Sequence, residues 1–218
     1  MIESCRDTNA LADAVSLAVA VELSAAIAAR GSASLVATGG RSPGPIYDRL
    51  SAADLDWSRI TIALSDERCV DEDHPDSNTR LVRSRLLIGP AAAARFLQLW
   101  PAPDPTALQG VTPFDVMMLG MGEDGHIASL IPGDSGLNEA LTTPDMLREV
   151  PAGLGKPPLA RITLTLSAIL NARAIFLLIG GAAKREVIER VLAGEDLPVG
   201  RLIAQAGDRL RIFWTPGD

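Results

Sequence analysis

The sequence predicts an α/β fold, in which a single domain is built on a mostly parallel, doubly wound (Rossmann-like) sheet with helices on both faces. Short apolar runs that suit buried strands alternate along the chain with longer segments that suit helices. No internal repeat, low-complexity tract or linker interrupts the 218 residues, so we expect one domain over residues 1–218. Three of the predicted strands end in a glycine pair or a charged triplet. Because the carboxyl ends of parallel strands meet at one edge of a sheet, we expect a ligand site at that edge.

The first predicted element is an amphipathic helix over residues 11–29, which ends at Gly31. Its apolar positions recur at a four-residue spacing: Leu11, Val15, Val19, Leu23 and Ile27. The segment is rich in alanine, but Asp13 and Glu22 interrupt it and no basic stretch precedes it. These features favour a core helix over a signal peptide or a membrane span.

The next part of the chain is expected to alternate strands with helices. Pro45 suits the first turn of a helix, and Ser77 or Asn78 suits a helix N-cap. In order, we expect a strand over 34–38, a helix over 45–50, a strand over 60–64, a helix from residue 77 or 78 through 87, and a short strand over 96–99. The proline-rich residues 101–113 are expected to form a loop.

The central stretch, FDVMMLGMGEDGHIASLIPG over residues 114–133, carries the most chemistry. Its apolar run predicts a buried strand over 116–119, and residues 126–130 are expected to form a first helical turn. Beyond it we expect a helical turn near 137–141 in an otherwise irregular segment, a strand over 161–166, a helix capped near Ser167, a strand over 174–179, a helix over 184–192 and a final strand over 210–214.

The composition restricts the partners of the protein. A net charge of −7 argues against nucleic acid and against an anionic membrane as partners. We therefore expect a small-molecule substrate. If that substrate is anionic, a local cluster of basic residues must bind it. Cys5 and Cys69 form no CxxC pair, which predicts free thiols in a reducing cytoplasm. The acidic loop at residues 71–74 lacks a second histidine, so neither a metal nor another cofactor is expected. A monomer or a weak homodimer is expected.

Two glycine-rich stretches match familiar motifs that the rest of the sequence does not support. The GxGxxG pattern at 120–125 is not followed, about 20 residues on, by a second strand that ends in an acid, as dinucleotide binding requires. The GxSxG pattern at 40–44 places Pro43 after Ser42, and proline lacks the N–H that a nucleophile elbow uses. The interpretation that remains for this second stretch is an anion-binding turn at a helix N-terminus, or a plain tight turn.

Side chains suited to acid/base chemistry gather at the predicted strand ends. They are the turn Gly39-Gly40-Arg41-Ser42, the charged residues Asp66, Glu67 and Arg68, the pair Asp124 and His126, and Lys184, with Arg161 at the start of another strand. The chain contains only one other histidine, His74, so His126 is the candidate proton carrier. Carboxylates, one histidine and several cations together suit a phosphorylated substrate that undergoes acid/base chemistry.

These motifs make the sequence resemble the 6-phosphogluconolactonase family. The resemblance covers nearly the whole chain, through TGGRSP, SDERCV with HPDSN, LGMGEDGHIASLIPG, ARITLTLSAI and GGAAKREVI. It implies hydrolysis of 6-phospho-D-glucono-1,5-lactone to 6-phosphogluconate in the oxidative pentose phosphate pathway. The departures are modest: Arg41 stands where serine is common, Cys69 where a larger apolar residue is frequent, and Ile131 where phenylalanine is usual.

The resemblance also implies roles for the site residues. The turn Gly39-Gly40-Arg41-Ser42 and Lys184 hold the 6-phosphate, with Arg161 as a further candidate, and Asp66 is included among the binding residues. His126 is the general base that activates water, and Arg68 lies near the lactone, where it stabilises the developing oxyanion. Asp124 either orients the imidazole or binds a sugar hydroxyl; the sequence leaves both open.

Two alternatives remain. The related glucosamine-6-phosphate deaminase/isomerase family shares the DGHIA core, but it has DEY where this chain has Asp66-Glu67-Arg68. It also has FNEP where this chain has Ser129-Leu130-Ile131-Pro132, so the glutamate of that family's chemistry is missing. The other alternative is a non-catalytic sugar-phosphate sensor. No basic DNA-binding module precedes residue 31, which disfavours it.

Overall fold

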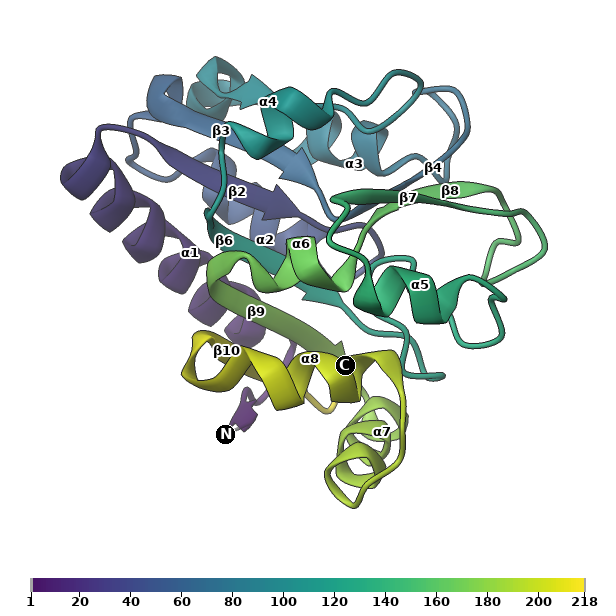
Figure 1. Cartoon of the computed structure of the whole chain (residues 1–218). Helices are drawn as coiled ribbons and strands as arrows, with labels where there is room; N and C mark the ends of the chain where they lie inside the picture. Colours follow the sequence, from purple (N-terminus) through teal and green to yellow (C-terminus); the bar gives the residue numbers. More distant parts are fainter. Residues whose placement is uncertain (1, 218) are drawn as a thin grey trace.

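A mostly parallel sheet with helices on both faces forms the core of the molecule, as the sequence predicts (Figure 1). The computed structural model describes residues 2–217. Within them, seven parallel strands follow the order β1-β10-β9-β6-β2-β3-β5. Their bounds are β1 Ile2–Ser4, β2 Ala33–Ala37, β3 Ile60–Leu64, β5 Arg95–Phe96, β6 Phe114–Gly120, β9 Ala172–Gly180 and β10 Leu210–Thr215.

The order of the strands reverses between β2 and β6. The chain runs outward from β2 through β3 to β5 and then returns to β6 on the other side of β2. Leu35 and Val36 of β2 pair there with Val116 and Met117 of β6. Open α/β sheets bind ligands in the crevice outside the carboxyl ends of such a strand pair. The topology therefore directs attention to the residues that follow Ala37 and Gly120.

Helices cover the two faces of this sheet. α1 and α2 lie on one face, and α6 and α8 lie on the other (Figure 1). The bounds are α1 Thr8–Arg30, α2 Gly44–Ser51, α3 Asn78–Arg85, α4 Pro105–Gln109, α5 Leu137–Thr142, α6 Leu166–Leu170, α7 Ala182–Leu192 and α8 Pro198–Ala206.

The long helix α1 follows the predicted amphipathic pattern. Asp7 caps its start, with the carboxylate 2.7 Å from the N–H of Ala10, and Gly31 ends it with a φ of 80°. By length and composition α1 is apolar enough to cross a membrane. Its buried positions, however, join the core of the domain beside β2, β6 and β9: Leu11, Ala12, Val15, Ser16, Val19, Leu23 and Ala26.

A second, smaller sheet lies beside the carboxyl edge of the first. It contains β4 Asp66–Arg68, β8 Arg161–Leu164 and β7 Leu147–Val150, all antiparallel. The charged triplet of β4 was expected to be the end of the preceding strand, but it forms a strand of its own. In this register Arg68 pairs with Arg161 across β4 and β8.

The predicted helical turn at residues 126–130 is wrong. The chain instead makes tight turns after β6, closed by backbone bonds from Gly125 N–H to the Gly122 carbonyl and from Gly122 N–H to the His126 carbonyl, at 3.1 and 3.0 Å. Ala128 has a φ of 48°, which no residue of a right-handed helix adopts. His126 is therefore held by a turn, not by the N-terminus of a helix.

Other differences concern short elements. The expected strand over 96–99 is reduced to β5, the expected loop over 101–113 contains α4, and the irregular segment over 132–160 contains β7 as well as the predicted helical turn. Neither β1 nor α8 was predicted. α4 and α8 both begin with a proline in the first turn, a start signal that was overlooked.

We predict that Tyr47→Phe lowers the free energy of unfolding by about 1–3 kcal/mol. The Tyr47 hydroxyl is fully buried, accepts from the N–H of Thr38 at 2.8 Å and donates to the Thr38 carbonyl at 2.6 Å. Phenylalanine leaves both buried backbone groups without this partner. Urea unfolding measures the loss.

Thr142→Val is the matched control, because it removes an exposed hydroxyl that donates to the Asn138 carbonyl at 2.8 Å. It should change the free energy of unfolding by no more than about 0.5 kcal/mol. Equal effects of the two variants would contradict this account of Tyr47.

Candidate active site

A cavity of about 260 Å³ opens at the carboxyl edge of β2 and β6, as the topology indicates. Its lining residues are Thr38, Gly39, Gly40, Arg41, Ser42, Pro43, Asp66, Arg68, Asn78, Gly120, Met121, Gly122, His126, Ala128, Lys156, Arg161, Leu178 and Lys184. The residues that the sequence gathers at this site line the cavity, except Asp124, which contacts His126, and Glu67, the middle residue of the charged triplet. The structure thus brings together residues from six separate parts of the chain.

His126 and Asp124 form a pair in the turn after β6. Asp124 Oδ1 lies 2.6 Å from His126 Nδ1 and also accepts from the backbone N–H of His126 at 3.2 Å. The imidazole is 27% exposed, and nothing in residues 2–217 bonds its Nε2. Nδ1–H donating to the carboxylate leaves Nε2 as a proton acceptor at the cavity.

Gly122 makes room for this pair. A Cβ at this position would lie 2.3 Å from His126 Nδ1 and 2.4 Å from Asp124 Oδ1. Any side chain at residue 122 would therefore displace both groups. Hydrogen bonding to the imidazole lowers the pKa of the Asp124 carboxyl, and the positive charge of a protonated His126 lowers it further.

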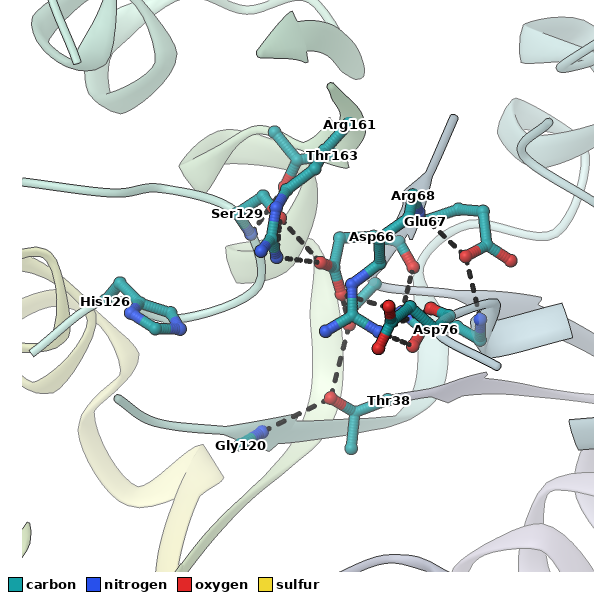
Figure 2. Close-up of polar contacts among 12 residues, drawn as sticks. Thr38, Asp66, Glu67, Arg68, Asp76, Gly120, His126, Ser129, Arg161 and Thr163 are labelled. Carbon is teal, nitrogen blue, oxygen red and sulfur yellow. Dashed lines mark hydrogen bonds and ion pairs between the residues drawn. The ribbon is translucent and has the colours of Figure 1, made fainter. Parts of the chain in front are cut away.

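Asp66 is the centre of a buried polar network at the other side of the cavity (Figure 2). Its Oδ2 accepts from the Ser129 hydroxyl at 2.6 Å and lies 3.8 Å from Arg161 Nη1. Its Oδ1 accepts from Asn78 Nδ2 at 3.4 Å. The carboxylate is thus surrounded by donors from three different segments, which fix its position.

Glu67 holds the start of α3 against β4. Its carboxylate is buried and accepts from the backbone N–H groups of Arg68, Asn78 and Thr79 at 2.7, 2.8 and 2.6 Å. Two of these donors belong to the first turn of α3, where a negative charge is favoured. Glu67 itself points away from the cavity residues and acts as an anchor, so its place in the charged triplet is structural.

Arg68 reaches the cavity because the same anchor places Asn78 beside it. Arg68 Nη1 donates to Asn78 Oδ1 and to the Asp76 carbonyl, each at 2.8 Å. Figure 2 shows the guanidinium of Arg68 and the imidazole of His126 on opposite sides of the site. A cation and a proton acceptor therefore face the same space.

The turn after β2 brings backbone close to this network. A Cβ on Gly39 would lie 1.9 Å from Asn78 Oδ1, so only glycine fits beneath the amide. Gly40 has a φ of 97°, which favours glycine, and Arg41 and Ser42 are exposed at the start of α2. The predicted anion-binding turn thus lines the cavity with backbone and side chains together.

Lys184 lies in the first turn of α7 and is partly buried at the cavity. Burial lowers the pKa of its ammonium group, as does the positive charge of Arg41, whereas Glu123 and Asp124 oppose the shift. Burial likewise lowers the pKa of Arg161, and the charge of Arg68 adds to the effect. An anionic ligand would offset the free-energy cost of burying the positive charges of Lys184 and Arg161.

Sequence reasoning missed three polar residues of the site. Asn78 and Lys156 line the cavity, and Ser129 bonds to Asp66. Apart from their places in the family motifs, Asn78 was considered as a helix cap and Ser129 as part of a helical turn. The signal that could have identified them was their position in the family motifs: Asn78 is the last residue of HPDSN, and Ser129 lies in DGHIASL. Lys156 lies in an irregular Gly/Pro-rich segment that carried no such signal.

Comparisons with known proteins identify the family of the chain and support its fold. The profile of the family described as glucosamine-6-phosphate isomerases/6-phosphogluconolactonase matches residues 6–214. The chain is 41% identical to the 6-phosphogluconolactonase of Rhizobium meliloti (strain 1021), over 95% of each chain. It is 38% identical to that of Pseudomonas putida, over 99% of this chain and 93% of the relative. The crystal structure of a 6-phosphogluconolactonase from Shewanella baltica OS155 superposes with a TM-score of 0.92 at 36% identity, over 99% and 97% of the two chains.

We predict that the Asp124 carboxyl titrates below its ordinary pKa, and that His126→Ala raises the value. The bond to His126 is the largest cause of the depression. A depressed folded-state pKa means that this pairing stabilises the fold above the unfolded-state pKa and that the gain is lost as pH falls through the folded-state value. Carboxyl NMR titration of the two proteins measures both values; an unchanged Asp124 pKa in the variant would contradict the pairing.

Proposed function

Because the chain belongs to the glucosamine-6-phosphate isomerase/6-phosphogluconolactonase family, we propose that it hydrolyses 6-phospho-D-glucono-1,5-lactone to 6-phosphogluconate. It is an enzyme of the 6-phosphogluconolactonase type, a carboxylic ester hydrolase that acts on a sugar phosphate. The reaction belongs to the oxidative pentose phosphate pathway. We place it in the cytoplasm, in keeping with the free thiols of Cys5 and Cys69.

The observation that carries the mechanistic part of this proposal is the His126–Asp124 pair at the cavity edge. With Nδ1–H donating to Asp124, Nε2 of His126 takes a proton from water, and the water oxygen attacks the lactone carbonyl, C1. The C1–O bond to the ring oxygen then breaks. The imidazolium returns its proton to that oxygen, which becomes the C5 hydroxyl of the product.

Two groups support the charges of this reaction. Arg68 faces His126 across the site, where its guanidinium stabilises the oxyanion that forms at C1. Asp124 stabilises the imidazolium through its 2.6 Å contact with Nδ1, which makes it a positioning residue. A δ-lactone is an activated ester, so a general base worth about 10²–10⁴-fold suffices without a covalent nucleophile.

The 6-phosphate is assigned to the opposite end of the cavity. The turn Gly39-Gly40-Arg41-Ser42 offers backbone N–H groups at the start of α2, and Arg41 and Lys184 supply positive charge. Binding the phosphate away from C1 orients the ring and places the carbonyl near His126. Arg161, by contrast, lies beside Asp66 and donates to Ser129 and to the Pro157 carbonyl, so we assign it to the C1 end.

We predict that His126→Ala loses about 10²–10⁴-fold in kcat for lactone hydrolysis while KM changes little. The reason is that the base acts on water and not on substrate binding. The assay uses 6-phosphogluconolactone generated in situ, with the spontaneous opening of the lactone subtracted. Turnover close to wild type would refute the role of His126.

His74→Gln is the matched control for this variant. His74 is half-exposed, outside the cavity, and its Nδ1 accepts from the N–H of Asp76 at 3.1 Å, a bond that glutamine can replace. Its kcat should equal that of the wild type. A loss as large as that of His126→Ala would show that the effect is not specific to the proposed base.

A further inference from the structure

The basic side chains of the cavity divide into two groups. Lys184 is influenced electrostatically by Arg41, on the side of the Gly39–Ser42 turn. Arg161 is influenced by Arg68 and by the carboxylates of Asp66 and Asp76. Besides these four residues, the cavity is lined by one more cation, Lys156. The contacts of its loop place Lys156 with Arg68 and Arg161.

The loop that carries Lys156 is tied to Arg161. Arg161 Nη2 donates to the carbonyl of Pro157 at 2.8 Å, and a Cβ on Gly155 would lie 3.0 Å from the same Nη2. Lys156 is exposed at the cavity and makes no hydrogen bond or ion pair within residues 2–217. Its ammonium group is therefore available to a ligand at the Arg161 end.

Unused donors are concentrated at this end. In the described chain three buried side-chain polar atoms have no hydrogen-bond partner, and two of them are Nε of Arg68 and Nε of Arg161. Arg161 is only 3% exposed, so leaving its N–H unpaired is costly. Asp66 and Asp76 are the carboxylates that influence Arg161, whereas Glu123 and Asp124 influence Lys184.

We propose that Arg68, Arg161 and Lys156 form a second anion subsite, which binds the C1 carboxylate of a sugar-acid phosphate. This inference rests on the proposed function, because lactone hydrolysis creates a carboxylate at C1 while the 6-phosphate occupies the other end. The cavity then holds one anionic group at each end of the ligand. The enzyme binds its open-chain product through two charges, and Lys156 is a product-binding residue.

Calorimetric binding of two ligands tests the subsite without any turnover. The probes are 6-phosphogluconate and glucitol 6-phosphate, which share the six-carbon chain and the phosphate and differ in carrying a carboxylate or an alcohol at C1. The wild type should prefer the acid by about tenfold or more, the size of one hydrogen bond between charged groups. Lys156→Met should reduce this preference by about two- to fivefold, as expected for an exposed lysine.

Lys184→Met is the matched control, since the chain contains only these two lysines. It should weaken both ligands by the same factor and leave the preference unchanged, because both carry the phosphate. Equal affinity of the wild type for the two ligands would overturn the subsite. A preference that survives Lys156→Met, or that is lost in Lys184→Met instead, would overturn the assignment of its residues.

The proposed function fails in a different way. If neither ligand binds the wild type, the cavity does not take a sugar phosphate at all. If both bind equally well and lactone hydrolysis is catalysed, the function stands and only the second subsite is refuted.

Discussion

The buried carboxylate of Glu67 is the constraint on which the active site depends. Three backbone N–H groups, from Arg68, Asn78 and Thr79, converge on it and join the small strand β4 to the start of α3. A buried charge is tolerated because these donors satisfy it and because the helix N-terminus favours it. Asp66 and Arg68 flank Glu67 in the chain, and their side chains thereby acquire fixed positions at the cavity.

Close backbone approach is the second requirement of the site. Gly39 leaves space for the Asn78 amide that orients Arg68, and Gly122 leaves space for the His126–Asp124 pair. Both glycines follow strands that are neighbours at the reversal of strand order, β2 and β6. The Thr38 hydroxyl, which accepts from the N–H of Gly120 at 3.3 Å, links these two strand ends directly. The topology creates the crevice, and the glycines make it deep enough for buried polar groups.

Periodicity and composition were sufficient to predict the five longer strands of the main sheet, β2, β3, β6, β9 and β10, because these are apolar runs separated by helical segments. They were also sufficient to place His126, Asp66 and Lys184 at one edge, since parallel strands end together. The antiparallel sheet of β4, β7 and β8 was not foreseen. Of its three strands only β8 was predicted as a strand; β4 and β7 are three and four residues long and carry charges, so local preference is too weak to reveal them.

The remaining errors also have physical causes. The turn at residues 126–130 was taken for a helix because glycines followed by apolar residues suit a helix start, and the positive φ of Ala128 has no sequence signal. Contacts between distant segments, such as those of Ser129 and Arg161 with Asp66, depend on the pairing of β4 with β8. Lys156 could be related to the site only after that pairing was known.

The central claim is that this site opens a sugar-phosphate lactone and does not process an amino sugar. The most direct test compares two reactions of the wild-type protein: hydrolysis of 6-phosphogluconolactone above its spontaneous rate, and release of ammonia from glucosamine 6-phosphate. The account predicts rapid lactone opening and no ammonia. Ammonia release together with lactone opening at only the spontaneous rate would contradict it and would assign the chain to the isomerase branch of its family.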